Sequence, residues 1–144
     1  MSAPISTTDA LKAKLAAAKA ARESLQEAKE TEPEDVRLQR ELDDEIAITA
    51  AIEAHGAIGD GIAVMRTKLG CVILKRPKQA AWRRFSDAKQ TTGAEARALA
   101  VACLAHPTAQ AFDAICEAYP AALEQAGALA CDLARAKGKE DAGK

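Results

Sequence analysis

The amino-acid sequence predicts a mainly α protein with a small β-hairpin: an N-terminal helical hairpin or arm, then a small helical domain with a short two-stranded β element. Apolar residues recur at helical spacing through most of the 144 residues, whereas residues 62–66 and 71–75 form two short apolar runs around a turn. Alanine supplies much of the 49% hydrophobic fraction and aromatic residues only 3%, which predicts a thin, helix-packed core.

The first 57 residues are predicted to form an acidic helical arm. One helix is expected over residues 8–29 and a second, after a Thr-x-x-Glu capping box, over residues 33–54. Their narrow apolar stripes predict a coiled-coil-like antiparallel hairpin or a longer kinked arm, which serves oligomerisation or docking, or only pads the domain. The residues assigned to this oligomerisation arm are Leu11, Leu15, Leu25, Leu38, Leu42 and Ile46.

Residues 58–135 are predicted to form a small domain of a hairpin and helices. The preceding HGAIGDG contains three glycines in seven residues and predicts a linker or sharp loop. The two apolar runs that follow are separated by TKLG, which indicates a hairpin with a four-residue turn. Because an isolated hairpin is marginal in water, it must lie on helices or be extended by another chain.

Helices are predicted after the hairpin, each bounded by a proline or a capping box. Pro77 begins the first and places Trp82 and Phe85 on one face. The helix expected over residues 94–105 is apolar nearly all round and should be the most buried. Two further helices follow the next two prolines, and residues 136–144 are expected to be a disordered tail. The predicted core anchors are Trp82, Phe85, Leu99, Phe112, Ile115 and Tyr119.

The net charge of −1 hides a strong asymmetry. Residues 1–57 contain seven Lys/Arg against twelve Asp/Glu, whereas residues 66–89 contain eight Lys/Arg against one aspartate. Such a dipolar layout favours head-to-tail self-association, or docking onto an acidic protein or nucleic acid.

The sequence offers no constellation for catalysis. His55 and His106 stand in a loop or at an element boundary, and the acidic run at residues 43–45 points adjacent side chains in different directions on a helix. No serine stands in a nucleophile-elbow context. We therefore expect a non-enzyme without a catalytic residue, a metal site or a cofactor.

The cysteines and the hydropathy pattern indicate the compartment. Cys71, Cys103, Cys116 and Cys131 form no CxxC motif or Cys/His cluster, which predicts reduced, buried thiols in a cytosolic protein. No apolar run approaches the ~18 residues that a membrane span needs, so no membrane partner is expected.

The stretch VILKRPKQAAWRRF, residues 72–85, has two interpretations. Positive charges around a single tryptophan could pair phosphates and stack a base. The spacing of Trp82 and Phe85 instead favours a core-facing pair with the arginines directed to solvent, which makes nucleic acid the less favoured partner. The residues assigned to a basic, partner-binding face are Arg66, Lys68, Lys75, Arg76, Lys78, Arg83 and Arg84.

From residue 62 onward the chain reads as a β segment ending in VILKRP, a helix with AAWRRF, a helix ending in ACLAHP, and then AFDAICEAYPAALEQAGALACDLA. This order resembles the small tail assembly chaperones of tailed bacteriophages. The resemblance covers residues 62–135 and does not extend to the acidic arm. It implies that the fold-setting positions are Arg76-Pro77, Trp82 with Phe85, Cys103 with Pro107, and Tyr119-Pro120.

The resemblance implies a protein that binds partly folded tail components in the cytoplasm of the infected host. Its clients would be the tape-measure protein or tail-tube subunits, and the arm would govern formation of a homo-oligomer. Two alternatives stay open. The protein could be a structural adaptor retained in the virion tail or neck, or a nucleic-acid-binding accessory protein that uses residues 66–89.

Overall fold

The structure, a computed structural model, describes residues 6–89 and 92–135. Within these residues the chain forms six helices and three strands, which confirms the predicted mainly α class with a small β element. It divides into two compact units, Met1–Gln39 and Arg40–Lys144. The predicted disordered tail lies outside the described residues. Across the described ranges, no helix has both the length and the apolar character that crossing a membrane requires.

The first unit contains helix α1 (Thr7–Glu30) and the beginning of helix α2 (Glu34–His55). Ser6 caps α1, since its Oγ accepts a hydrogen bond from the Asp9 amide at 3.1 Å. No residue of α1 is buried, and Leu11 keeps 59% of its surface exposed. The leucine stripe of α1 is therefore uncovered in the described chain.

The second unit begins inside α2, earlier than the predicted domain boundary, because the C-terminal part of α2 packs against the sheet. Asp44, Ile48 and Ala51 are the buried residues of α2. The predicted stripe containing Leu42 and Ile46 lies on the other side, where both side chains are more than half exposed. The apolar residues in the sequence indicated the outward face of α2, because Asp44 interrupts the apolar residues on the face that packs against the sheet.

Strands β1 (Ile62–Thr67) and β2 (Gly70–Lys75) form the predicted hairpin, and β3 (Leu104–His106) pairs antiparallel with β2. The strand order is β1-β2-β3. The register closes the hairpin with a two-residue turn rather than the predicted four. β3 occupies the end of a predicted helix: α4 stops at Cys103, and the chain continues in extended conformation beside β2.

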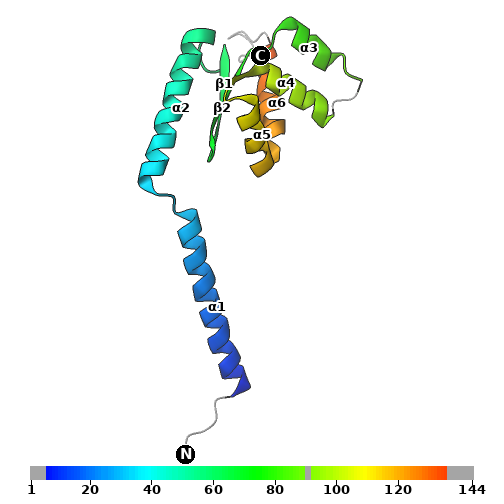
Figure 1. Ribbon diagram of the computed structural model, residues 1–144. Helices are drawn as coiled ribbons and strands as arrows, with labels where there is room; N and C mark the ends of the chain where they lie inside the picture. Colours follow the sequence, from blue (N-terminus) through cyan, green and yellow to red (C-terminus); the bar gives the residue numbers. More distant parts are fainter. Residues whose placement is uncertain (1–5, 90–91, 136–144) are drawn as a thin grey trace, which may run out of the picture. The chain divides into compact units, whose positions relative to one another are not determined.

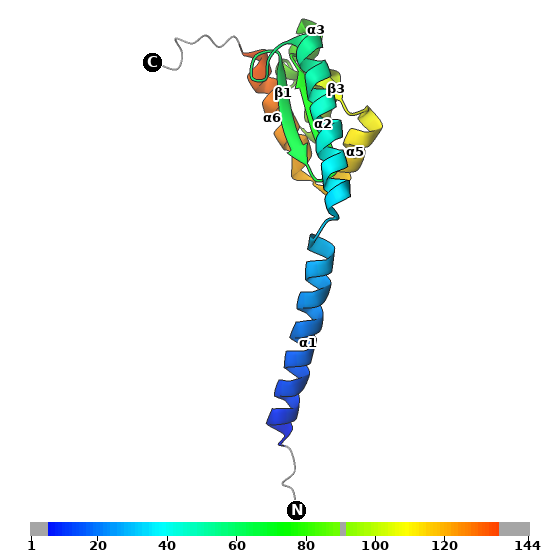
Figure 2. The ribbon, with the colours of Figure 1, turned by 90° about the vertical axis from the view of Figure 1, so that its left-hand side faces the viewer.

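The sheet is the middle of three layers in the second unit (Figure 1). On one face lies α2, seen in front of the strands in Figure 2. On the other face lie α4 (Gly93–Cys103) and α6 (Ala121–Ala134), with α5 (Ala109–Ala118) against α6. Helix α3 (Gln79–Ser86) packs on α4 and is therefore separated from α2 by the sheet layer.

Alternate residues of β2 enter two different cores. Cys71 and Ile73 pack with Ile48 of α2. Val72 and Leu74 enter the larger core, which contains α4, α5 and α6. The alternation follows from the two-residue period of a strand, and burial on both faces explains why this strand reads as a continuous apolar run.

Small side chains fill the contact between α4 and α6. Ala100, Ala126 and Ala130 are completely buried, and a Cβ added to Gly127 would lie 3.8 Å from the Ala96 Cβ. The two helices therefore approach closely. Each such residue buries little apolar area, as expected for a thin core.

The predicted core anchors fall into two groups. Those that lie in or against the larger core are Trp82, Phe85, Leu99, Phe112 and Ile115. Tyr119 differs from the prediction: it is the C-cap of α5 and is 39% exposed. The helical pattern placed it on the apolar face, but the helix ends one residue earlier and its backbone turns away.

A buried carboxylate ties α2 to the hairpin. Asp44 is 6% exposed, and its Oδ1 accepts a hydrogen bond from the Cys71 amide at 2.9 Å. β3 pairs with β2 only at Ile73 and Leu74, so this amide lies beyond the β2–β3 pairing. Asp44 thus satisfies a strand donor that would otherwise be buried without a partner.

Arg76 holds the opposite end of the sheet. Its Nε donates to the Leu133 carbonyl at 3.1 Å, and its Nη2 donates to the Asp60 carbonyl at 2.6 Å. Leu133 is in the last turn of α6, where backbone carbonyls lack helical partners and a cation is favourable. Arg76 is therefore engaged within the fold rather than directed only to an external partner.

We predict that Asp44→Ala destabilises the second unit. The substitution leaves the buried Cys71 amide without its acceptor, which should lower the free energy of unfolding by about 1–3 kcal/mol. Asp44→Asn keeps an oxygen acceptor and should cost less. Urea unfolding followed by circular dichroism measures the effect, with the exposed Glu53→Ala on the same helix as the control. Equal stability of Asp44→Ala and the control would contradict the role of this hydrogen bond.

We also predict that stability falls at alkaline pH because of buried thiols. Burial raises the pKa of Cys71 to about 12 and that of Cys103 to about 11, from an ordinary value of 9. The unfolded chain loses these protons near pH 9 while the folded chain keeps them, so this contribution is complete below pH 9 and is lost as the pH rises toward 11 and 12. The expected slope is at most about 1.4 kcal/mol per pH unit for each thiol.

Urea unfolding at pH 8, 9 and 10 measures this dependence. Cys71→Ala removes one of the two thiols, so its free energy of unfolding should decline less steeply above pH 9 than that of the parent chain. Identical slopes for the two chains would show that the Cys71 thiol does not contribute.

Candidate binding groove

A groove with a volume of about 390 Å³ lies between α3 and α4. Phe85 and Leu99 supply its larger apolar side chains, and Arg84 and Glu95 are the charged residues among those that line it. The remaining lining residues are alanines, namely Ala81, Ala88, Ala94, Ala98 and Ala102.

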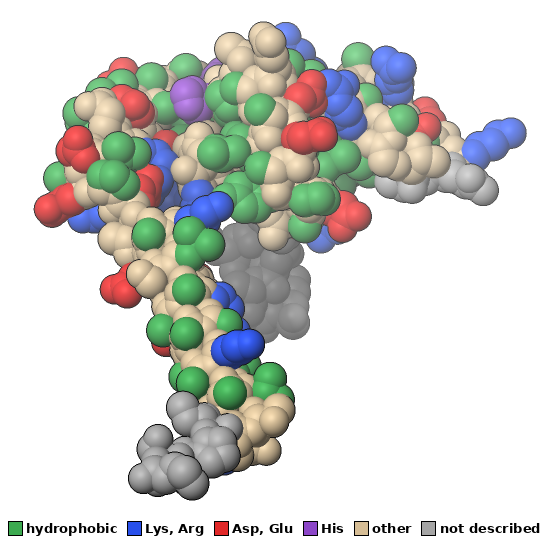
Figure 3. All heavy atoms as spheres, turned by 60° about the horizontal axis from the view of Figure 1, so that its bottom comes forward, with side chains coloured by type: hydrophobic (Ala, Val, Ile, Leu, Met, Phe, Trp, Pro, Cys, Tyr) green, Lys and Arg blue, Asp and Glu red, His purple; other side chains and the backbone are tan. Residues whose placement is uncertain are grey.

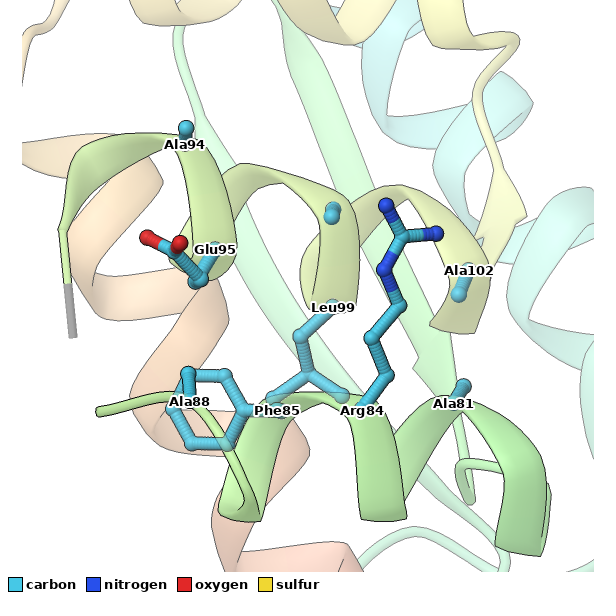
Figure 4. A pocket seen from close by; sticks show the side chains of 9 residues that line it. Ala81, Arg84, Phe85, Ala88, Ala94, Glu95, Leu99 and Ala102 are labelled. Atoms are coloured by element: carbon cyan, nitrogen blue, oxygen red, sulfur yellow. The ribbon is translucent and has the colours of Figure 1, made fainter. Parts of the chain in front are cut away.

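The floor of the groove is an aromatic–aliphatic contact. Figure 4 shows Leu99 extending from α4 toward α3 beside Phe85, with Arg84 extending from α3 alongside α4. Leu99 is buried in the larger core, whereas Phe85 is only partly buried. Phe85 also contacts Trp82, with ring centroids 5.8 Å apart. The groove is therefore an opening above the edge of the larger core.

Local sequence signals position both walls. α3 begins two residues after Pro77, which cannot continue a strand. α4 begins at the predicted capping box, in which the Thr92 amide donates to the Glu95 side chain at 3.0 Å. This bond holds the Glu95 carboxylate at the first turn of α4. The α4 wall consists of exposed alanines spaced four residues apart, which lie on one side of a helix.

Arg97 fixes α4 from another side. Its Nη2 and Nε donate to the two carboxylate oxygens of Asp113 on α5, at 2.7 and 3.1 Å. This bidentate bond raises the pKa of the Arg97 guanidinium. The α4 wall of the groove is thereby held against the rest of the domain.

The groove has the chemistry of an apolar docking surface. Its two charged side chains have opposite signs and come from different helices. Over residues 6–89 and 92–135, no three His, Cys, Asp or Glu side chains are grouped as a metal site requires. Small alanine walls allow an incoming helix to approach the backbone closely, and the Phe85–Leu99 floor offers apolar area for its larger side chains.

The predicted basic face is divided by the fold. Its residues lie at the hairpin turn (Arg66, Lys68), around the end of β2 (Lys75, Arg76, Lys78) and on α3 (Arg83, Arg84). Arg66 forms an ion pair with Glu45 of α2 at 3.0 Å, and Arg76 is engaged as described above. Of these basic residues, Arg84 of α3 lines the groove.

A second, more open hollow of about 510 Å³ lies beside the hairpin turn. Arg66, Lys68 and Arg40 line it together with Tyr119. Arg40 Nη1 donates to the Lys68 carbonyl at 3.2 Å, and Arg66 is paired with Glu45. The arginines here therefore hold α2 to the hairpin, and Tyr119 contributes aromatic surface outside the core.

The residue pattern anticipated the floor of the groove better than its walls. Trp82, Phe85 and Leu99 were expected in the core; Phe85 and Leu99 form the floor of the groove, and Trp82 contacts Phe85. The alanine walls were not assigned to a site, because alanine is common throughout this chain. Their regular spacing at Ala94, Ala98 and Ala102 was the available signal.

Comparison of the chain with protein-family models, with curated proteins and with solved structures finds no match. The assignment of a function therefore depends on the geometry described above and on the resemblance in the order of segments.

We predict that Phe85→Ala loosens α3. Loss of a partly buried aromatic ring should lower the free energy of unfolding by about 1–3 kcal/mol, less than for a completely buried one. Emission of Trp82, the only tryptophan, should shift to longer wavelength as its neighbour is removed. Arg83→Ala, on the exposed side of the same helix, should change stability by less than about 0.5 kcal/mol. Unchanged emission and stability in Phe85→Ala would contradict the packing of α3.

Proposed function

We propose that this protein is a bacteriophage tail assembly chaperone whose α3–α4 groove binds a helical segment of the tape-measure protein or of a tail-tube subunit. The observation that supports this role is the uncovered apolar groove, with alanine walls and a Phe85–Leu99 floor. A groove of this kind can cover the apolar face of a client helix before that helix is assembled.

The resemblance to tail assembly chaperones supports the choice of client. Its segments correspond to consecutive structural elements here: β2 ends within VILKRP, α3 contains AAWRRF, α4 ends within ACLAHP and is followed by β3, and α5 and α6 come last. The positions that the resemblance marks as fold-setting include Trp82, Phe85 and Cys103, which lie in or against the larger core. The protein would act in the host cytoplasm during tail assembly.

Helix-in-groove binding predicts which residues the client helix should present. An amphipathic helix presents apolar residues at three- and four-residue spacing, which matches the spacing of the alanines on α4. Arg84 and Glu95 have opposite charge, so a client helix with an acidic and a basic residue flanking its stripe would bind in one orientation. Neither charge is needed for the apolar contact itself.

The nucleic-acid alternative is less well supported. A phosphate-binding surface needs several cations on one face, but Arg66 and Arg76 are engaged by Glu45 and Asp60, and the basic residues are divided among three places. The virion adaptor alternative uses the same groove and differs in whether the protein remains in the particle.

We predict that Ala98→Leu blocks the groove. The added side chain occupies space that the client helix would fill, and overpacking of about 1–3 kcal/mol corresponds to roughly fivefold to 100-fold weaker binding. Fluorescence anisotropy with labelled segments of the tape-measure protein measures the affinity. Ala128→Leu, at an exposed alanine of α6 outside the groove, is the matched control and should bind like the parent chain.

Equal affinity of Ala98→Leu and Ala128→Leu for every tape-measure segment that binds would contradict the groove as the site.

Salt dependence in the same assay distinguishes client binding from nucleic-acid binding. Binding in the apolar groove should change little between low and physiological ionic strength, whereas binding of nucleic acid through phosphates should fall steeply.

A further inference from the structure

Helix α1 presents a seam of the kind found in coiled coils. Leu11, Leu15, Ala18, Arg22 and Leu25 follow one another at alternating four- and three-residue spacing. All of α1 is exposed, and Figure 3 shows hydrophobic and basic side chains along its surface. Within the described residues nothing packs against this seam.

Helix α2 presents a second seam with the same spacing. Leu38, Leu42, Glu45, Thr49 and Ile52 repeat the pattern of α1 at a constant separation of 27 positions. All five are exposed. Leu38, Leu42, Thr49 and Ile52 are not among the α2 residues that pack on the sheet. Glu45 lies at the sheet edge, where it forms an ion pair with Arg66 of β1 at 3.0 Å.

Charge complementarity identifies the partner of each seam. In a parallel pair with this register, residues flanking the seam place Lys12 beside Glu34 and Lys19 beside Glu41. Glu34 also forms an ion pair within α2, with Arg37 at 3.9 Å. Arg22 then lies beside Thr49, one turn from Glu53. No like-charged flanking pair arises in this alignment.

Pairing of either helix with its own copy is less favourable. Two parallel α1 helices would place Arg22 against Arg22 and Lys14 beside Lys19. Two parallel α2 helices would place Glu45 against Glu45. Among parallel pairs, α1 therefore fits α2 better than either helix fits its own copy.

One chain cannot form the parallel pair with itself. The three residues 31–33 connect the end of α1 to the start of α2, and a connection of this length spans at most about 14 Å. A parallel arrangement would require it to return along the whole of α1, about 35 Å. The α2 seam must then receive α1 from another molecule.

We propose that α1 of one copy pairs in parallel with α2 of a second copy, with Leu11 against Leu38, Leu15 against Leu42 and Leu25 against Ile52. Each copy offers both seams, so two copies close reciprocally as a dimer, or successive copies join head to tail. The proposal concerns the arm alone and does not depend on the client of the α3–α4 groove.

Disulfide trapping tests the register of the pair and whether its two helices come from separate chains. Chains with Leu15→Cys and chains of different mass with Leu42→Cys are mixed and oxidised. A disulfide-linked heterodimer is expected, because the two positions face each other across the seam. Leu15→Cys mixed with Leu69→Cys, at an exposed leucine of the hairpin turn, is the matched control and should give no heterodimer above the parent chain with its native cysteines.

An antiparallel pairing of α1 and α2 would give a different disulfide. An antiparallel pair, including a hairpin within one chain, would bring Leu11 near Ile52. A chain with both Leu11→Cys and Ile52→Cys would then form a disulfide within one molecule, without a heterodimer from the first mixture. That result would overturn the proposal.

Charge reversal tests the flanking pairs. Lys12→Glu with Lys19→Glu should weaken self-association about tenfold in analytical ultracentrifugation, because two attractive pairs become repulsive. Adding Glu34→Lys and Glu41→Lys should restore the parent dissociation constant. A parent chain that sediments as a monomer at high micromolar concentration, or a fourfold variant no stronger than the double variant, would also overturn the proposal. Binding of tape-measure segments by the double variant would show that the groove functions independently.

Discussion

The fold depends on the burial of β2 on both faces. Cys71 and Ile73 face α2 while Val72 and Leu74 face α4 and α6, so a single six-residue strand organises two cores. The helices on either side cannot contact one another directly and are placed through this strand. Asp44 and Arg76 add a hydrogen-bonded link at each end. As a result, the α3–α4 groove and the outward seam of α2 belong to separate layers.

Local patterns predicted local structure well. The capping box at Thr92 and Glu95, the hairpin and the aromatic pair of α3 each depend on residues a few positions apart. What the sequence did not predict depends on distant partners. β3 is extended because it pairs with β2 some thirty residues earlier, although its residues fit the end of a helix. The inward face of α2 was missed because Asp44 looks polar until the Cys71 amide is placed against it.

The candidate site shows the same division. The floor residues Phe85 and Leu99 followed from helical spacing, whereas the walls required knowing that α3 packs beside α4. The basic residues formed one group in the sequence, but the hairpin separates them and Arg76 serves the fold. Two uncovered apolar surfaces, a groove and a helical seam, fit a protein that binds partners while it assembles with its own copies.

The proposed chaperone role is tested most directly by the amount of this protein in purified phage particles compared with infected-cell lysate, measured by quantitative mass spectrometry. A chaperone that leaves after assembly should be abundant in the lysate and absent from the particles. Presence in particles at a fixed ratio to the tail proteins would contradict the role and would identify the protein as a structural adaptor.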